Sequence, residues 1–126
     1  KAERKNILTS IVSIHSFTPE WKGKKRDIEM GILWDKDDRL AKIFLKNYKN
    51  INVGNNKPYS GRLKNDTLYK HGTRKGFPHV LIEIRQDLIN TQNKQKIWAD
   101  KIYKTLIYNV DKIGLFKKKK YGSFVD

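Results

Sequence analysis

The sequence has 126 residues, which is the size of one domain. It has no cysteine, which excludes disulfide frameworks, thiolate metal sites and cysteine nucleophiles. No apolar stretch approaches the ~20 residues of a membrane-spanning helix. Nothing near Lys1 has the apolar core of a secretory signal. The sequence therefore excludes an integral membrane protein, and we expect a cytoplasmic one.

The chain is strongly basic, with 28 basic and 13 acidic residues and a formal net charge of +15. Such an excess favours a polyanionic partner, because Lys and Arg displace counterions from phosphate backbones. However, most of the basic residues are Lys, and Arg is the better reader of bases and phosphates. We therefore expect no nucleic-acid partner. The densest basic run, Lys117 to Lys120, is predicted to lie in a basic tail (117–126) after a single folded unit (1–116).

Four segments have the residue pattern of β-strands. They are residues 7–17, 27–35, 51–53 and 79–85. The first is nearly continuous in β-branched and apolar residues, which predicts a buried strand. Its alternation places Ile11, Ser13, His15 and Phe17 on one face. The last segment, HVLIEIR, is the clearest strand and is typical of a central one. Residues 18–27 and the GNNKPYSG segment (54–61) are rich in Gly, Pro, Asn and charges, so we expect loops there.

Three segments have helical patterns. Asp37 or Asp38 can cap a helix that runs to about Lys49, and Asp66 or Thr67 can cap a short helical turn through His71. A long helix is predicted over residues 91–113. The apolar stripes of the two longer helices are Leu40, Ala41, Phe44, Leu45 and Tyr48 in the first, and Ile97, Ile102, Leu106, Val110 and Ile113 in the second. The alternation of strands and helices predicts a three-layer α/β/α fold with a mostly parallel or mixed central sheet.

Glu83 is the most unusual residue, because it lies inside an otherwise apolar strand. An unpaired buried carboxylate is costly, so it must meet a cation, a metal or a hydrogen-bond donor. One interpretation is a structural ion pair with the neighbouring Arg85 or another base. The alternative is a general base whose pKa is set by burial and nearby charge.

His15 lies near the end of the first predicted strand, where ligands gather in open α/β sheets. A lone His at such a position is either structural or a metal ligand. A catalytic zinc needs about three protein ligands, and this chain offers His15 as one good candidate and His71 as a poorer second. Any remaining ligands must come from elsewhere.

Three arginines and one asparagine are candidates for binding a substrate carboxylate. Arg26 and Arg62 lie in predicted loops, Arg85 ends a strand and Asn56 lies in a turn. The two-pronged guanidinium suits a carboxylate. For Arg62, an exposed loop charge is an equally good interpretation.

Several blocks resemble, in order and approximate spacing, the N-formylglutamate amidohydrolase family. The blocks are SIHSFTP (13–19), KKRDIEMGIL (24–33), VGNNKPYSG (53–61), KHG (70–72), HVLIEIRQDLI (79–89) and WADKI (98–102). The first and fifth blocks are specific together. Family members are about twice as long as this chain, which resembles their carboxy-terminal half, so the expected unit is an incomplete half of a larger zinc-peptidase-like domain.

The resemblance implies a zinc-dependent hydrolase that cleaves N-formyl-L-glutamate, or a related N-acyl amino acid, to the amino acid and the acyl acid. By this comparison His15 matches a zinc-binding histidine, and Glu83 matches the general base that deprotonates the zinc-bound water. Arg26, Asn56 and Arg85 match positions near the substrate carboxylates, and His71 lies in a block beside the site. The remaining zinc ligands are expected in the amino-terminal half, without which we expect the chain to be inactive.

Two other hypotheses remain open on the residues alone. The first is a basic module without catalysis that binds RNA or an acidic partner, with Trp21, Tyr59 and Tyr69 placed in loops where bases could stack. The second is a remnant that folds without chemistry. A homodimer, or pairing with the other half of the family fold, would cover exposed sheet edges.

Overall fold

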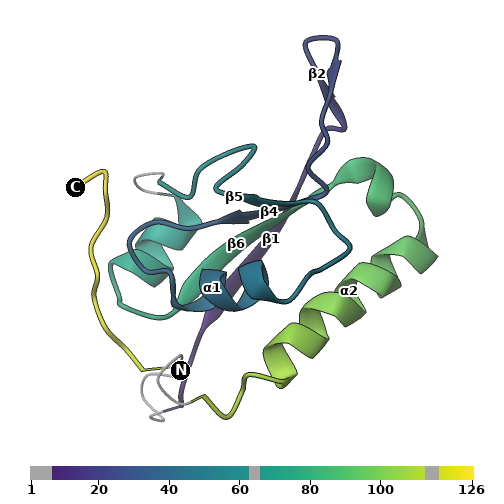
Figure 1. The fold of residues 1–126 in the computed structure, drawn as a ribbon. Coiled ribbons are helices and arrows are strands. Elements are labelled where there is room, and N and C mark those ends of the chain that lie inside the picture. The colour runs from purple at the N-terminus through teal and green to yellow at the C-terminus, as the bar shows by residue number, and fades with distance from the viewer. Residues whose placement is uncertain (1–6, 63–65, 113–116) are drawn as a thin grey trace.

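A four-stranded mixed sheet forms the centre of the molecule in the computed structural model, which describes residues 7–62, 66–112 and 117–126 (Figure 1). The strand order is β1 (Ile11–Phe17), β6 (His79–Arg85), β4 (Met30–Leu33) and β5 (Val53–Asn55). β6 pairs with β1 in parallel and with β4 in antiparallel orientation, and β4 pairs with β5 in parallel. The expected α/β fold with a mixed sheet is thus confirmed, and β6 is central as predicted.

The principal core lies on the sheet face that α1 (Arg39–Lys46) and α2 (Gln92–Ile107) cover (Figure 1). Alternation along the strands directs every second side chain to this face. The buried residues of this core are Met30, Ile32, Leu40, Ala41, Phe44, Val80, Ile82, Ile84, Trp98 and Ile102. The core residues of β4, β6 and α1 are therefore those that the apolar pattern of the sequence predicts to be buried.

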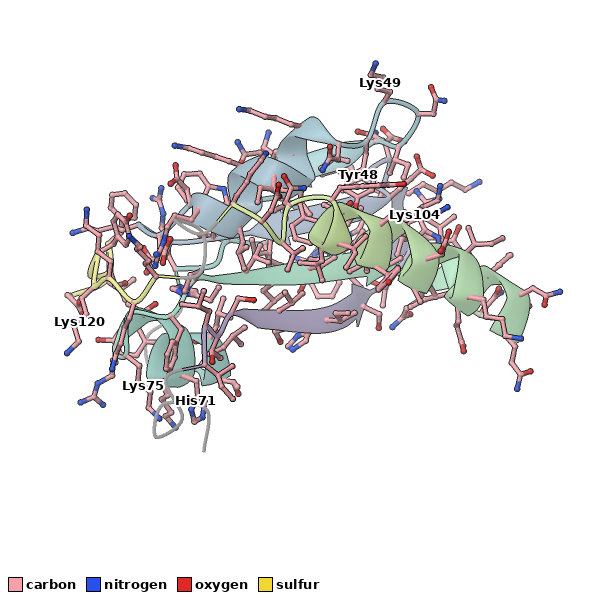
Figure 2. All side chains as sticks on the ribbon, turned by 90° about the horizontal axis from the view of Figure 1, so that it is seen from below. Tyr48, Lys49, His71, Lys75, Lys104 and Lys120 are labelled. Carbon is pink, nitrogen blue, oxygen red and sulfur yellow. The ribbon has the colours of Figure 1, made fainter. Side chains whose placement is uncertain are left out.

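Helix α1 buries Leu40, Ala41 and Phe44, as its apolar stripe predicts, but it ends at Lys46 rather than near Lys49. At its start, the Arg39 backbone N–H donates to Oδ1 of Asp37 at 3.2 Å. Tyr48 follows the helix and reaches α2, where its hydroxyl lies 2.8 Å from that of Thr105 (Figure 2).

Helix α2 begins where the sequence predicts, because Oγ1 of Thr91 accepts a hydrogen bond from the Lys94 backbone N–H. The predicted buried stripe is wrong at Ile97 and Val110, whose side chains are 55% and 56% exposed. The helix is rotated so that the large indole of Trp98 packs with Ile102 on the sheet. The helix ends at Ile107, and Ile113 lies outside the described residues.

The opposite sheet face carries a smaller core made of Leu33, Leu68 and Leu81. A short π-helical segment, η2 (Tyr69–Thr73), packs at this face. The sequence predicts that Asp66 or Thr67 caps this helical turn. In the structure, Oδ1 of Asp66 accepts a hydrogen bond from the Tyr69 backbone N–H at 2.6 Å. A side chain at Gly72 would lie 2.4 Å from the imidazole of His79, so the glycine allows η2 to approach β6.

Two segments expected to be loops contain short strands. Residues 18–27 form a hairpin of β2 (Glu20–Trp21) and β3 (Lys24–Lys25), which projects beyond the sheet (Figure 1). Lys22 and Gly23 at its tip both have positive φ, 49° and 75°, which is the backbone of a tight hairpin turn. Similarly, β5 takes in Gly54 and Asn55. Strands of two or three residues are too short to leave a periodic pattern.

Strand β1 is an edge strand in the described part of the chain, which differs from the buried strand that its composition predicts. It begins at Ile11, and the preceding Ile7 and Leu8 are 55% and 56% exposed. Within the strand, Ile14 is 55% exposed. Among the seven residues of β1 only Phe17 is buried in the described part of the chain.

Residues 117–126 lie against the folded unit. The Lys119 backbone N–H donates to the Gly76 carbonyl at 2.7 Å, and the hydroxyl of Ser123 and the backbone N–H of Phe124 both donate to the buried carboxylate of Asp35.

Between β6 and α2 the chain forms η3 (Gln86–Leu88), a single 3-10 turn. Among the described residues, no helix combines the length and apolar character needed to cross a bilayer.

Candidate active site

His15 and Glu83 lie side by side on neighbouring parallel strands. They are register partners in the pairing of β1 with β6, so their side chains project from the same face of the sheet. Both residues lie close to the carboxyl ends of their strands, where ligands gather in open α/β sheets. The structure therefore brings together the two residues that the sequence singled out for metal binding and base catalysis.

Glu83 is buried without a full set of partners. The residue is 8% exposed, and its Oε2 has no hydrogen-bond partner among the described residues. Burial raises the pKa of the Glu83 carboxyl, and electrostatic interactions with His15 and Arg26 partly oppose this rise. The ion pair with Arg85 is not formed, because the Arg85 guanidinium pairs with Asp87 instead.

Two glycines make room for a turn beside Glu83. Gly31 is the register partner of Glu83 on one side and of Gly54 on the other. A Cβ at either glycine would lie 2.6 Å or 2.5 Å from the carbonyl oxygen of Lys57. The backbone of the 56–61 turn thus rests directly on this face of the sheet. Sequence reasoning missed this role, although glycines inside strand patterns signal close backbone approach.

Asn56 shapes that turn. Its φ is 53°, and its Oδ1 accepts hydrogen bonds from the backbone N–H groups of Trp34 and Gly61 at 2.8 Å and 3.2 Å. Its own backbone N–H donates to the Ile32 carbonyl at 2.9 Å. The side-chain oxygen therefore organises the turn, and a role of the residue in substrate binding stays a prediction.

Arg26 is held in an aromatic setting. Its guanidinium carbon lies 5.6 Å, 5.7 Å and 5.3 Å from the ring centroids of Phe17, Trp21 and Tyr59. It donates hydrogen bonds to the Tyr59 hydroxyl at 2.9 Å and to the carbonyl and hydroxyl oxygens of Thr18. Charge and ring stacking together fix this cation near the carboxyl ends of β1 and β6.

Arg85 holds the backbone of the segment that contains Arg26 in place. Its Nε and one terminal nitrogen donate to the two carboxylate oxygens of Asp87 at 2.7 Å and 3.1 Å. The other terminal nitrogen donates to the Arg26 carbonyl at 2.7 Å. The hydrogen bond to Asp87 raises the pKa of Arg85 and lowers that of Asp87. A groove of about 440 Å³ opens beside both arginines and Lys25.

His71 is not brought to this site. It is exposed on η2, on the outer side of that segment together with Lys75 (Figure 2). η2 packs at His79, four residues before Glu83 on β6, which is about 13 Å at the rise of an extended strand. The described residues contain no group of three His, Cys, Asp or Glu side chains able to hold a metal ion. His15 is therefore one potential ligand without a complete set.

The aromatic residues expected to stack bases are differently placed. Tyr69 is buried at the start of η2, and its hydroxyl donates to a carboxylate oxygen of Asp126, so the expectation of a loop tyrosine is wrong there. Trp21 and Tyr59 are exposed but contact Arg26. Arg62 stacks on Phe124, with 4.1 Å between the guanidinium carbon and the ring centroid.

Comparison with known proteins identifies the family. The family model of N-formylglutamate amidohydrolase matches residues 2–90. The crystal structure of the gene product Atu2144 from Agrobacterium tumefaciens is similar, with 34% sequence identity and a TM-score of 0.75. The match covers 90% of this chain and 47% of that one, so this chain spans less than half of the length of that neighbour. Comparison with curated proteins gives no match. The chain belongs to the N-formylglutamate amidohydrolase family.

Proposed function

We propose that this chain forms one part of the active site of a zinc-dependent amidohydrolase whose substrate is N-formyl-L-glutamate or a related N-acyl amino acid. The observation that carries the proposal is the buried Glu83 carboxylate, which lacks a partner at Oε2 and lies in register with His15. Membership of the amidohydrolase family supports the reaction class.

Glu83 is suited to act as the general base. A carboxylate whose pKa is raised by burial binds a proton more strongly than an exposed one. In amide hydrolysis it would accept a proton from the attacking water and then deliver it to the leaving amine nitrogen. The nearby charge of Arg26 opposes this rise in the pKa and so favours the ionised carboxylate that a general base requires.

His15 is the residue that would bind the metal. His15 is exposed on the edge strand, so a ring nitrogen of its imidazole is accessible to a metal ion. When bound, zinc polarises the scissile carbonyl and lowers the pKa of water. Because such a site uses about three protein ligands, the other ligands would come from the part of the family fold that this chain does not span.

The cation Arg26 would bind an acidic group of the substrate. Its guanidinium is oriented by Tyr59 and Thr18 beside the groove at the strand ends, and a fixed guanidinium suits a carboxylate. Arg85 would act indirectly, because its hydrogen bonds hold the Arg26 carbonyl and Asp87. Such positioning would present the scissile amide to Glu83.

The test is zinc-dependent hydrolysis of N-formyl-L-glutamate and a panel of N-acyl amino acids. The sample is this chain fused to the part of the Agrobacterium tumefaciens protein outside the match. We expect acyl-acid release that requires zinc, that Glu83→Gln abolishes and that Asp111→Asn, an exposed control after α2, leaves intact. His15→Ala is expected to weaken zinc binding, measured by calorimetry. Turnover that persists in Glu83→Gln, or no metal-dependent turnover on any substrate, would contradict the proposal.

A further inference from the structure

We propose that a basic cleft beside α1 binds a small phosphorylated molecule, at a place separate from the candidate active site. The cleft, called the α1 cleft below, has a volume of about 460 Å³, which is in the range of small-ligand sites. Side chains of α1, of the segment after α2 and of residues 117–126 line it. The lining residues that matter most here are Asp38, Arg39, Lys42, Lys46, Lys112 and Tyr121.

The α1 cleft lies on the side of the sheet opposite to the one that carries the active-site residues. Alternation along β6 directs Ile82 and Ile84 to the core that α1 and α2 cover. Glu83 therefore projects from the other face of the sheet, together with its register partner His15. Among the described residues, none lines both the α1 cleft and the groove at the strand ends. The proposal thus adds a second site and does not rest on the proposed function.

The α1 cleft has more positive charge than its own carboxylate neutralises. Asp38 pairs with Lys42 across one turn of α1 at 3.1 Å. Lys46 and Lys112 are exposed, and neither has an ion pair within the part of the chain that the structure describes. Like charges that line the same cleft repel each other. A bound anion would therefore remove an unfavourable interaction.

One wall of the cleft is fixed by a buried ion pair. The guanidinium of Arg39 donates to both carboxylate oxygens of Asp37 at 2.9 Å and 2.7 Å and to the Gly76 carbonyl at 3.2 Å. Its carbon lies 4.9 Å from the centroid of the Tyr121 ring, so the arginine holds this tyrosine in place. Because its charge is paired with Asp37, Arg39 shapes the cleft and leaves the anion to the lysines.

The segment after α2 forms another wall, and Figure 2 shows it running beside α1. Nδ2 of the buried Asn109 donates to the Thr105 carbonyl at 2.7 Å, and the Lys112 backbone N–H donates to the Asn109 carbonyl at 3.1 Å. Lys42 and Lys46 are four residues apart on α1 and therefore lie on the same side of the helix. The three lysines thus reach the cleft from two segments whose backbones are held by hydrogen bonds.

The donors of the cleft favour a phosphate over a carboxylate. A Lys ammonium is a compact charge with three donors, which suits the several oxygens of a tetrahedral phosphate, whereas a free Arg fork matches a carboxylate. The fork of Arg39 is occupied by Asp37. A phosphate monoester has a charge of about −1.5 to −2 at pH 7, which complements the two lysines that lack an ion pair.

A small molecule suits the cleft better than an RNA strand does. Binding of single-stranded RNA uses a continuous basic groove with aromatic rings on which bases stack. In the α1 cleft, the ring of Tyr121 stacks on Arg39 instead. A second hollow of about 330 Å³ adjoins the cleft at Asn47, but there Lys104 is paired with Asp100 at 2.9 Å. The surplus charge is therefore smaller in that hollow than in the α1 cleft.

The experiment titrates this chain with inorganic phosphate, diphosphate, AMP and ADP, and follows binding by calorimetry and by amide chemical shifts in NMR. Glutarate, a dicarboxylate, is the chemical control. We expect saturable binding of diphosphate and ADP, with shift changes confined to residues 38–47, 109–112 and 119–121. Glutarate should not change these shifts. Tighter binding of ADP than of diphosphate would assign the site to a nucleotide, and equal affinity would assign it to the phosphates alone.

Two matched double variants separate a site from general attraction to a basic protein. Lys46→Gln with Lys112→Gln removes the unpaired charges of the cleft and is expected to weaken binding about tenfold or more. Lys70→Gln with Lys75→Gln removes the same charge from exposed positions on and after η2 and should leave the affinity unchanged. Amide spectra that superpose away from the substitutions show that each variant keeps its fold.

Four results would overturn the proposal. They are no saturable binding of any phosphate compound, equal weakening by both double variants, shift changes spread over the whole surface, and glutarate binding in the cleft as tightly as diphosphate. A single-stranded RNA that binds more tightly than ADP and loses affinity in Lys104→Gln would also overturn it, because the site would then be a longer groove for a nucleic acid.

Discussion

Replacing Glu83 by Gln is expected to stabilise the folded chain at neutral pH. The carboxylate is 8% exposed, and its Oε2 has no partner among the described residues. Removing a charge from water without full hydrogen bonding is costly. Gln has nearly the same shape but no charge, so the variant keeps the packing and lowers the cost of burial.

The size of the effect follows from the environment of the carboxylate. A buried unsatisfied polar group costs about 1–3 kcal/mol, and a charged group costs more. The positive charge of Arg26 offsets part of this cost, and the amide of Gln still loses some hydration. We therefore expect Glu83→Gln to raise the free energy of unfolding by about 1 kcal/mol.

The pH dependence distinguishes this explanation from a packing effect. Burial raises the pKa of Glu83 in the folded chain above its ordinary value of 4.5, so the folded state binds the proton more tightly than the unfolded state does. The cost of the charge is thus absent below pH 4.5, grows as pH rises toward the folded pKa, and is complete above it. The advantage of Glu83→Gln should follow the same course.

Urea unfolding at several pH values measures these differences. Glu20→Gln is the control, because Glu20 is exposed on β2 and its replacement should change stability little at any pH. An equal effect of Glu83→Gln at acidic and neutral pH, or a less stable variant at neutral pH, would refute the reasoning. A stabilising substitution at this position would also show that the native carboxylate is kept at a cost to the fold.

Three further substitutions test the packing of the fold. Gly31→Ala is expected to destabilise the chain by about 2 kcal/mol, because the new Cβ would lie 2.6 Å from the Lys57 carbonyl oxygen; urea unfolding measures it. Trp98→Ala is expected to cost about 3–5 kcal/mol in the same assay, because it empties a buried site between α2 and the sheet. Ser123→Ala removes a donor to the buried Asp35 carboxylate, which should cost about 1–2 kcal/mol and speed limited proteolysis of residues 117–126.

Each of these has a contradicting result. A Gly31→Ala variant as stable as the original chain would mean that the 56–61 turn does not rest on the sheet. If Trp98→Ala destabilised the chain no more than Ile97→Ala does, the face of α2 that contains Trp98 would not be the one packed against the core. Unchanged proteolysis of Ser123→Ala would show that the contact with Asp35 does not hold the last residues in place.

Local pattern was sufficient for some elements and insufficient for others. β6 was predicted with its observed bounds, because an apolar run of that length favours a central strand. The hairpin of β2 and β3 was missed, because each strand has two residues. The orientation of α2 was predicted wrongly, since apolar residues such as Ile97 and Trp98 adjoin in the sequence and several buried faces fit the pattern equally well.

The candidate site divides in the same way. His15 and Glu83 were found from residue type, because an ionisable side chain in an apolar strand is costly to bury unless a partner compensates for it. Tyr59 and Thr18 were not assigned to Arg26, since contacts between loops leave no periodic signal. The pairing of Arg85 with Asp87, two residues along, competes with the pairing to Glu83, and only side-chain geometry separates the two.

The sequence by itself determined the family, the α/β class and the unusual carboxylate, because these depend on residue type and short-range order. Only the tertiary structure decided that His15 and Glu83 are register partners and that β1 lies at an edge. Both features arise from backbone hydrogen bonds between segments distant in the chain. The residues within one strand do not encode which strand will lie beside it, so the meeting of these two side chains is a property of the assembled sheet.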